Sequence, residues 1–155
     1  YLIAVGGLAG LTIRLLAGLY AGRAPFDSLR AGSAWVLVGG FGWLIMATDQ
    51  PVAFAIGLVI ANAFGWGWPG LQHLSMARRF PTSTAAASGI SQTGIAAGLL
   101  SRPAALGLLV TTAGWSWMWL SAAIAAFLGS AVVWVASSRI PTLRVTQHAE
   151  GGDGF

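Results

Sequence analysis

Charged residues divide this chain into long apolar runs. Residues 31–48 and 50–77 carry no charge, and between Phe80 and Ser138 the only charged residue is Arg102. A helix rises about 1.5 Å per residue, so about 20 apolar residues cross the hydrocarbon layer of a membrane, which is about 30 Å thick. The pattern therefore predicts membrane-spanning helices near 31–48, 52–76, 84–110 and 117–137.

The first segment, residues 1–17, is also apolar but meets Arg14 early. The residues before Arg14 extend only about 20 Å as a helix. We interpret this segment as a fifth spanning helix that lacks its beginning. A secretory signal peptide is the alternative, and it is disfavoured because the positive charge follows the apolar run and no A-x-A cleavage site comes next.

The composition agrees with a membrane protein. Hydrophobic residues make up 56% of the chain and charged residues 8%, whereas soluble domains carry about a quarter charged residues. The predicted fold class is all-α, a polytopic transmembrane helix bundle over residues 1–138. Residues 139–155 are polar and are expected to form a disordered cytoplasmic tail. The chain has no cysteine, so disulfide scaffolds and cysteine-based metal sites are excluded.

The arginines predict how the bundle is oriented. If five helices alternate in direction, one side of the membrane receives Asp49 and no arginine, and the other receives Arg14, Arg23, Arg30, Arg78, Arg79, Arg139 and Arg144. Arginine-rich loops face the cytoplasm, so we expect a multi-pass protein of the inner (cytoplasmic) membrane with a cytoplasmic carboxy terminus. The basic excess is thus a signal of topology. Nucleic acid is not an expected partner, because no basic face with interleaved aromatics is present.

The span 84–110 carries a stripe of small and hydroxyl residues on one face. Gly94 and Gly98 in this stripe predict close helix packing, and Pro103 allows a bend. Arg102 lies deep in the span, so it must face protein or a water-filled cavity, or extend outward to the interface. We hold two readings open for it: an anion contact or gating charge, and a structural or interfacial residue.

The span 52–76 carries polar residues near its centre. Asn62 lies near the predicted midplane and shares a face with Trp66, while Gly65, Pro69 and Gly70 make the helix easy to bend or interrupt. An interrupted helix with polar residues at mid-membrane is typical of a transport path. The alternative is that Asn62 hydrogen-bonds a neighbouring helix.

Catalytic chemistry has no support in the sequence. No predicted span contains an acidic residue, and no G-x-S-x-G, H-E-x-x-H or Walker A pattern occurs. His73 and His148 are far apart in the predicted topology, so a metal site is not expected. We therefore predict neither an enzyme nor a cofactor.

Two stretches resemble the carboxy-terminal half of major facilitator superfamily transporters. The first is similar to the family's R-x-x-x-G-x-x-x-D-R cytoplasmic loop, with Gly22 at the Asp position and Arg30 after it: Arg14-Leu-Leu-Ala-Gly18-Leu-Tyr-Ala-Gly22-Arg23. The second is similar to the tenth and eleventh helices of bacterial members, with Arg102 replacing the usual glycine: Gly65-Trp-Gly-Trp-Pro69-Gly70-Leu71, Arg78-Arg-Phe-Pro81, then Thr84 to Gly94, Gly98 and Pro103-x-x-x-Gly107.

This resemblance implies that the five spans are helices eight to twelve of a fragment. The amino-terminal half and the seventh helix would then be its missing partners. The implied function is secondary active transport (a permease) that moves a small solute by alternating access. The residues implied to line the cavity are Asn62, Trp66, Gln92 and Arg102, and those of the cytoplasmic loop are Arg14, Gly18, Arg23 and Arg30.

The positive charge of Arg102 and the nearby tryptophans favour an anionic solute or an aromatic acid. A small polytopic membrane scaffold or assembly subunit, without transport activity, is the alternative from another class. The lipid bilayer is an expected partner under either reading.

Overall fold

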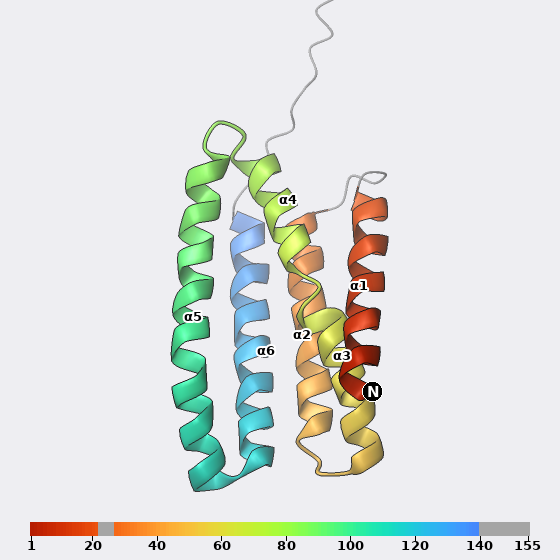
Figure 1. Ribbon diagram of the computed structural model, residues 1–155. Helices are drawn as coiled ribbons and strands as arrows, with labels where there is room; N and C mark the ends of the chain where they lie inside the picture. Colours follow the sequence, from red (N-terminus) through yellow and green to blue (C-terminus); the bar gives the residue numbers. More distant parts are fainter. Residues whose placement is uncertain (22–26, 140–155) are drawn as a thin grey trace, which may run out of the picture.

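The computed structural model describes residues 1–21 and 27–139, which fold into α-helices without any strand (Figure 1). The all-α class predicted from the apolar runs is confirmed. Arg23 and the tail from residue 140 onward lie outside the described residues. The helices are α1 (Leu2–Ala21), α2 (Ser28–Met46), α3 (Pro51–Gly65), α4 (Pro69–Arg79), α5 (Thr84–Ala113) and α6 (Trp115–Arg139).

Five helical segments among the described residues are long and apolar enough to cross a membrane. Four of them are the single helices α1, α2, α5 and α6, and the fifth is the interrupted segment Pro51–Arg79, made of α3 and α4. A polytopic membrane bundle is therefore confirmed. The observed bounds of the last four segments lie within three residues of the predicted ranges at either end.

The first helix is longer than the apolar run predicts. Helix α1 has 20 residues and continues past Arg14 to Ala21, so Arg14 lies within a helix and not in a loop. The turns after Arg14 contain Leu15, Leu16 and Leu19, which are good helix formers with exposed apolar side chains. At about 1.5 Å per residue, α1 reaches about 30 Å, which is enough to cross a membrane.

The fifth segment is interrupted between α3 and α4. Helix α3 ends at Gly65, and Pro69 begins α4 after a turn over residues 66–68. Proline has no N–H and its ring conflicts with the carbonyl four residues earlier, so the α-helical bond from residue 69 to Gly65 cannot form. This is the place where the glycine and proline pattern predicted an interruption.

Helix α2 is the centre of the bundle and packs against both α3 and α6. Its contact with α3 is made through glycines. A Cβ added to Gly39 would lie 2.5 Å from the Cα of Gly65, and a Cβ added to Gly42 would lie 2.6 Å from the nitrogen of Ala61. Without side chains at these positions, the two backbones approach closely, as in other glycine-rich membrane contacts.

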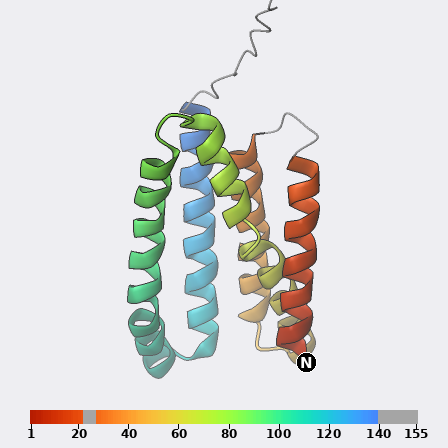
Figure 2. The same ribbon diagram turned by 45° about the horizontal axis from the view of Figure 1, so that its top comes forward.

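Helix α5 stands at one edge of the bundle and α1 at the other, in both Figure 1 and Figure 2. No residue of α5 is buried, although the helix packs on α6 and α4. A Cβ at Gly94 or Gly98 would meet no atom of the described residues within 4 Å, so the packing predicted for these glycines has no partner in this part of the chain. Pro103 lies within a continuous α5.

Candidate functional site

The interruption between α3 and α4 is bridged by an arginine from α1. The Nε of Arg14 donates a hydrogen bond to the carbonyl oxygen of Trp66 at 3.0 Å, and its Nη2 donates to the same oxygen at 2.5 Å. In an uninterrupted helix this carbonyl would accept from the N–H of residue 70. The guanidinium takes the place of that backbone donor, so it satisfies a polar group that the interruption leaves within a segment long enough to span a membrane.

Asn62 lies one helical turn before Trp66 and faces α1. Its Nδ2 donates to the carbonyl of Leu58 at 2.9 Å, so this hydrogen bond stays within α3 and does not reach a neighbouring helix. Glycines of α1 pass close by: a Cβ on Gly6 would lie 3.3 Å from the Asn62 side chain, and one on Gly10 would lie 3.0 Å from its carbonyl. Gly6, Gly10 and Arg14 are spaced by four residues and therefore share one face of α1.

Arg14 separates two cavities, which we together call the α1 cleft. The smaller, of about 170 Å³, is lined by Gly6, Gly7, Gly10, Leu11, Arg14, Asn62 and Trp66. The larger, of about 660 Å³, is lined by Arg14, Ala17, Gly18, Gly67, Pro69, Gly70, Leu71, Leu74 and Arg78. The cleft thus contains the two candidates Asn62 and Trp66, the interruption residues Pro69 and Gly70, and two residues expected in the loop, Arg14 and Gly18.

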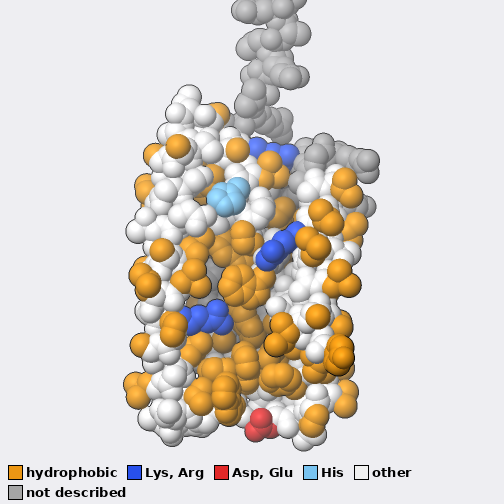
Figure 3. Space-filling model, in the orientation of Figure 1, with side chains coloured by type: hydrophobic (Ala, Val, Ile, Leu, Met, Phe, Trp, Pro, Cys, Tyr) orange, Lys and Arg blue, Asp and Glu red, His pale blue; other side chains and the backbone are white. Residues whose placement is uncertain are grey.

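The other two cavity candidates lie on α5, outside the cleft. The Nε2 atoms of Gln92 and His73 are 3.3 Å apart, and Gln72 is hydrogen-bonded to Ser91, so these contacts join α4 to α5. Arg102 is half-buried, and no hydrogen bond or ion pair joins it to another described residue. In Figure 3, arginine side chains lie at mid-height on the face between α1 and α5, among hydrophobic side chains.

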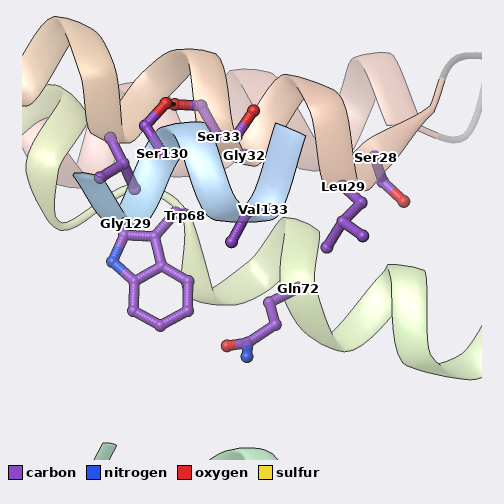
Figure 4. Close-up of a pocket in the computed structure, with 10 residues that line it drawn as sticks. Ser28, Leu29, Gly32, Ser33, Trp68, Gln72, Gly129, Ser130 and Val133 are labelled. Carbon is purple, nitrogen blue, oxygen red and sulfur yellow. Dashed lines mark hydrogen bonds between the residues drawn. The ribbon is translucent and has the colours of Figure 1, made fainter. Parts of the chain in front are cut away.

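A third cavity, of about 240 Å³, lies between α2, α4 and α6. Figure 4 shows Trp68 and Gln72 on one side of it and Ser33, Gly129 and Ser130 on another. Ser130 donates its hydroxyl to the Ser33 carbonyl at 2.7 Å, so this wall is internally satisfied. The Gln72 Oε1 is buried without a hydrogen-bond partner among the described residues. The cavity is mostly apolar and carries no charged group.

An ion pair joins α2 to the end of α4. The Nη2 of Arg79 lies 2.9 Å from each carboxylate oxygen of Asp27, and the Arg79 side chain is only 2% exposed. Asp27 is also the N-cap of α2 and accepts from the N–H of Leu29 at 3.0 Å. Burial alone would raise the pKa of Asp27, but the hydrogen bonds from Arg79 and Leu29 and the charge of Arg79 lower that pKa below its ordinary value.

Sequence reasoning missed two of these features. The contact of Arg14 with Trp66 and the pair of Asp27 with Arg79 each join residues 52 positions apart, so no local motif reports them. A local signal did exist for the close approach of α1 to α3, since Gly6-x-x-x-Gly10 is a small-residue packing pattern.

The described ranges contain no group of three or more potential metal ligands. No family model, curated protein or solved structure matches this chain.

Proposed function

We propose that this chain is part of a secondary active transporter that moves a small solute across the cytoplasmic membrane by alternating access. The observation that carries this proposal is the interrupted span, in which Trp66 ends α3 at a cleft lined by Asn62 and Arg14. Interrupted helices that face a cavity near mid-membrane are a recurring way to build a solute site in transporters. Arg14 and Asn62 place a charged and an amide side chain in the lining of this cleft, and such side chains within membrane spans often mark solute or ion pathways.

The proposed orientation rests on where the charges lie along the helices. Arg79 ends α4, Arg139 ends α6, and Asp27 with Arg30 begins α2, so these groups share one end of the bundle, while Asp49 lies between α2 and α3 at the opposite end (Figure 1). The arginine-rich end is assigned to the cytoplasm by the positive-inside rule. We therefore propose that the chain lies in the cytoplasmic membrane with the end of α6 on the cytoplasmic side.

The test is uptake by the complete protein in proteoliposomes against a panel of labelled solutes, with and without a proton gradient. Trp66→Ala is expected to lower the rate for a transported solute at least about tenfold, because the substitution removes an aromatic side chain that lines the cleft. Trp117→Ala is the matched control, since this exposed tryptophan lies at the start of α6, outside the cleft. A folded protein that accumulates no solute under any gradient contradicts transport and favours the scaffold alternative.

A further inference from the structure

We propose that Arg14 is an anion-binding residue of the α1 cleft, which exchanges the carbonyl of Trp66 for the carboxylate of a small organic anion and thereby releases the junction between α3 and α4. This inference rests on the proposed function, because movement of the junction is a transport step only in a transporter.

The positive charge of Arg14 is not balanced by any described carboxylate. Its two hydrogen bonds go to one neutral carbonyl, and within residues 1–21 and 27–139 no carboxylate pairs with it. Asp27 is engaged by Arg79 and Arg30, and Asp49 accepts from Ser116 at the other end of the bundle. A guanidinium within a membrane span normally faces a counter-charge or water. Arg14 therefore donates to a neutral acceptor, and no charge among the described residues compensates its own.

Arg14 has more N–H donors than the Trp66 carbonyl uses. A guanidinium has five N–H groups in a planar fork, and two of those of Arg14 point at the Trp66 oxygen. Cavities of about 170 Å³ and 660 Å³ adjoin the same side chain, so there is room for a ligand on either side of it. Asn62 and Trp66, a residue that is 46% exposed, line the smaller one.

A carboxylate is a stronger acceptor for Arg14 than the neutral carbonyl of Trp66. A carboxylate accepts two parallel N–H bonds from a guanidinium and carries the opposite charge, so it forms shorter and stronger bonds than a neutral carbonyl does. A small carboxylate that enters the cleft is therefore the preferred partner of Arg14. The lining of the larger cavity adds the side chain of Arg78, a second positive charge, at the end of α4.

Exchange of the acceptor frees the junction between α3 and α4 from α1. While Arg14 holds the Trp66 carbonyl, α1 is tied to the point where α3 and α4 meet. When the guanidinium turns to a ligand, that carbonyl loses its donor and α4 is no longer fixed to α1 at this point. Ligand binding then favours a state in which the junction has moved, which is the coupling that alternating access needs.

The experiment uses the absence of cysteine from this chain. Single cysteines are introduced into the complete protein at Ala17, which lines the larger cavity, and at Leu71, which is buried at the start of α4. Ala131→Cys on the exposed surface of α6 is the positional control. Alkylation rates are measured without any ion gradient, in sodium benzoate and in benzamide, which has the same shape without the charge.

Benzoate is expected to slow alkylation of Ala17→Cys and to speed that of the buried Leu71→Cys as the junction moves, with no effect at Ala131→Cys and none from benzamide. Arg14→Gln is expected to weaken the benzoate effect at least about tenfold, because charge-assisted hydrogen bonds are lost. Arg14→Lys keeps the charge without the fork, so its effect should be intermediate. The lysine variant also keeps the test decisive if the glutamine variant does not fold.

Three results would overturn the assignment. Benzoate and benzamide could protect Ala17→Cys equally, benzoate could give no protection, or benzoate could protect fully in both Arg14→Lys and Arg14→Gln. These outcomes are separable from failure of the proposed function. Anion-dependent labelling without uptake contradicts transport and leaves the anion site standing, whereas uptake without anion-dependent labelling contradicts the anion site alone.

Discussion

Asp27 performs two tasks at once in this fold. Its carboxylate caps α2 through the N–H of Leu29, and it also pairs with Arg79 at the end of α4. The second task places a counter-charge beside a guanidinium that is almost wholly buried. Removing one partner of a buried pair costs more than the pair itself contributes, because the other charge loses its compensation.

The variant Asp27→Asn separates the two tasks. Asparagine caps helices about as well as aspartate, so the substitution removes the charge and keeps the cap. We expect it to lower the free energy of unfolding by about 2 kcal/mol, less than for a fully buried pair because the carboxylate is 26% exposed. The measurement is thermal unfolding in detergent. The control is Asp49→Asn, because Asp49 is an exposed carboxylate that accepts from Ser116. Equal melting temperatures for both variants and the parent chain would refute the prediction.

The same residue predicts how stability depends on pH. The folded state lowers the pKa of Asp27 below its unfolded value of about 4. The unfolded chain therefore takes up the proton first, so the contribution of the ion pair is fully present above pH ~4 and is lost as pH falls through the folded pKa. Melting temperatures measured between pH 3 and 7 should decline more steeply at the acidic end for the parent chain than for Asp27→Asn. Parallel curves would show that Asp27 is not the titrating group.

At the scale of elements, the contact of α2 with α3 depends on glycine. A Cβ at Gly42 would lie 2.6 Å from the Ala61 nitrogen and 2.8 Å from the Gly57 carbonyl oxygen, and both are backbone atoms that a rotamer change cannot move. Gly42→Ala should therefore push the helices apart and lower the free energy of unfolding by about 1–3 kcal/mol. Gly89→Ala is the matched control, because its Cβ meets no described atom within 4 Å.

The control should be neutral or slightly stabilising, since alanine is favoured over glycine within a helix by about 0.5–1 kcal/mol. Both variants are compared by thermal unfolding in the same detergent. If Gly42→Ala and Gly89→Ala have the same melting temperature, the α2–α3 contact does not depend on glycine.

The sequence predicts the membrane spans and the interruption but not which helices contact one another, and each outcome has a physical reason. Membrane spans follow from the length of apolar runs, and the interruption follows from Pro69, which has no N–H to donate. The first span was predicted to end at residue 17, and α1 continues to Ala21 because helix formers such as Leu19 follow Arg14. The contact of Arg14 with Trp66 depends on which helices pack together, and apolar periodicity does not specify that.

At the scale of the whole molecule, α5 differs from the other helices. It is the longest one described, none of its residues is buried, and it carries Gln92 and Arg102 within an apolar segment. The α1 cleft holds two of the four predicted cavity residues, so the other two belong to the solute path only if α5 faces it. Transport in the complete protein tests this directly.

We expect Arg102→Ala in the complete protein to lower the uptake rate about tenfold or more without abolishing membrane insertion. The reason is that the half-buried guanidinium has no partner among the described residues, so its donors are available to an anionic solute or to gating contacts. Arg139→Ala is the control, since this exposed arginine ends α6 and its charge serves topology. Unchanged uptake kinetics in Arg102→Ala would instead assign Arg102 to the lipid interface, where its long side chain reaches water.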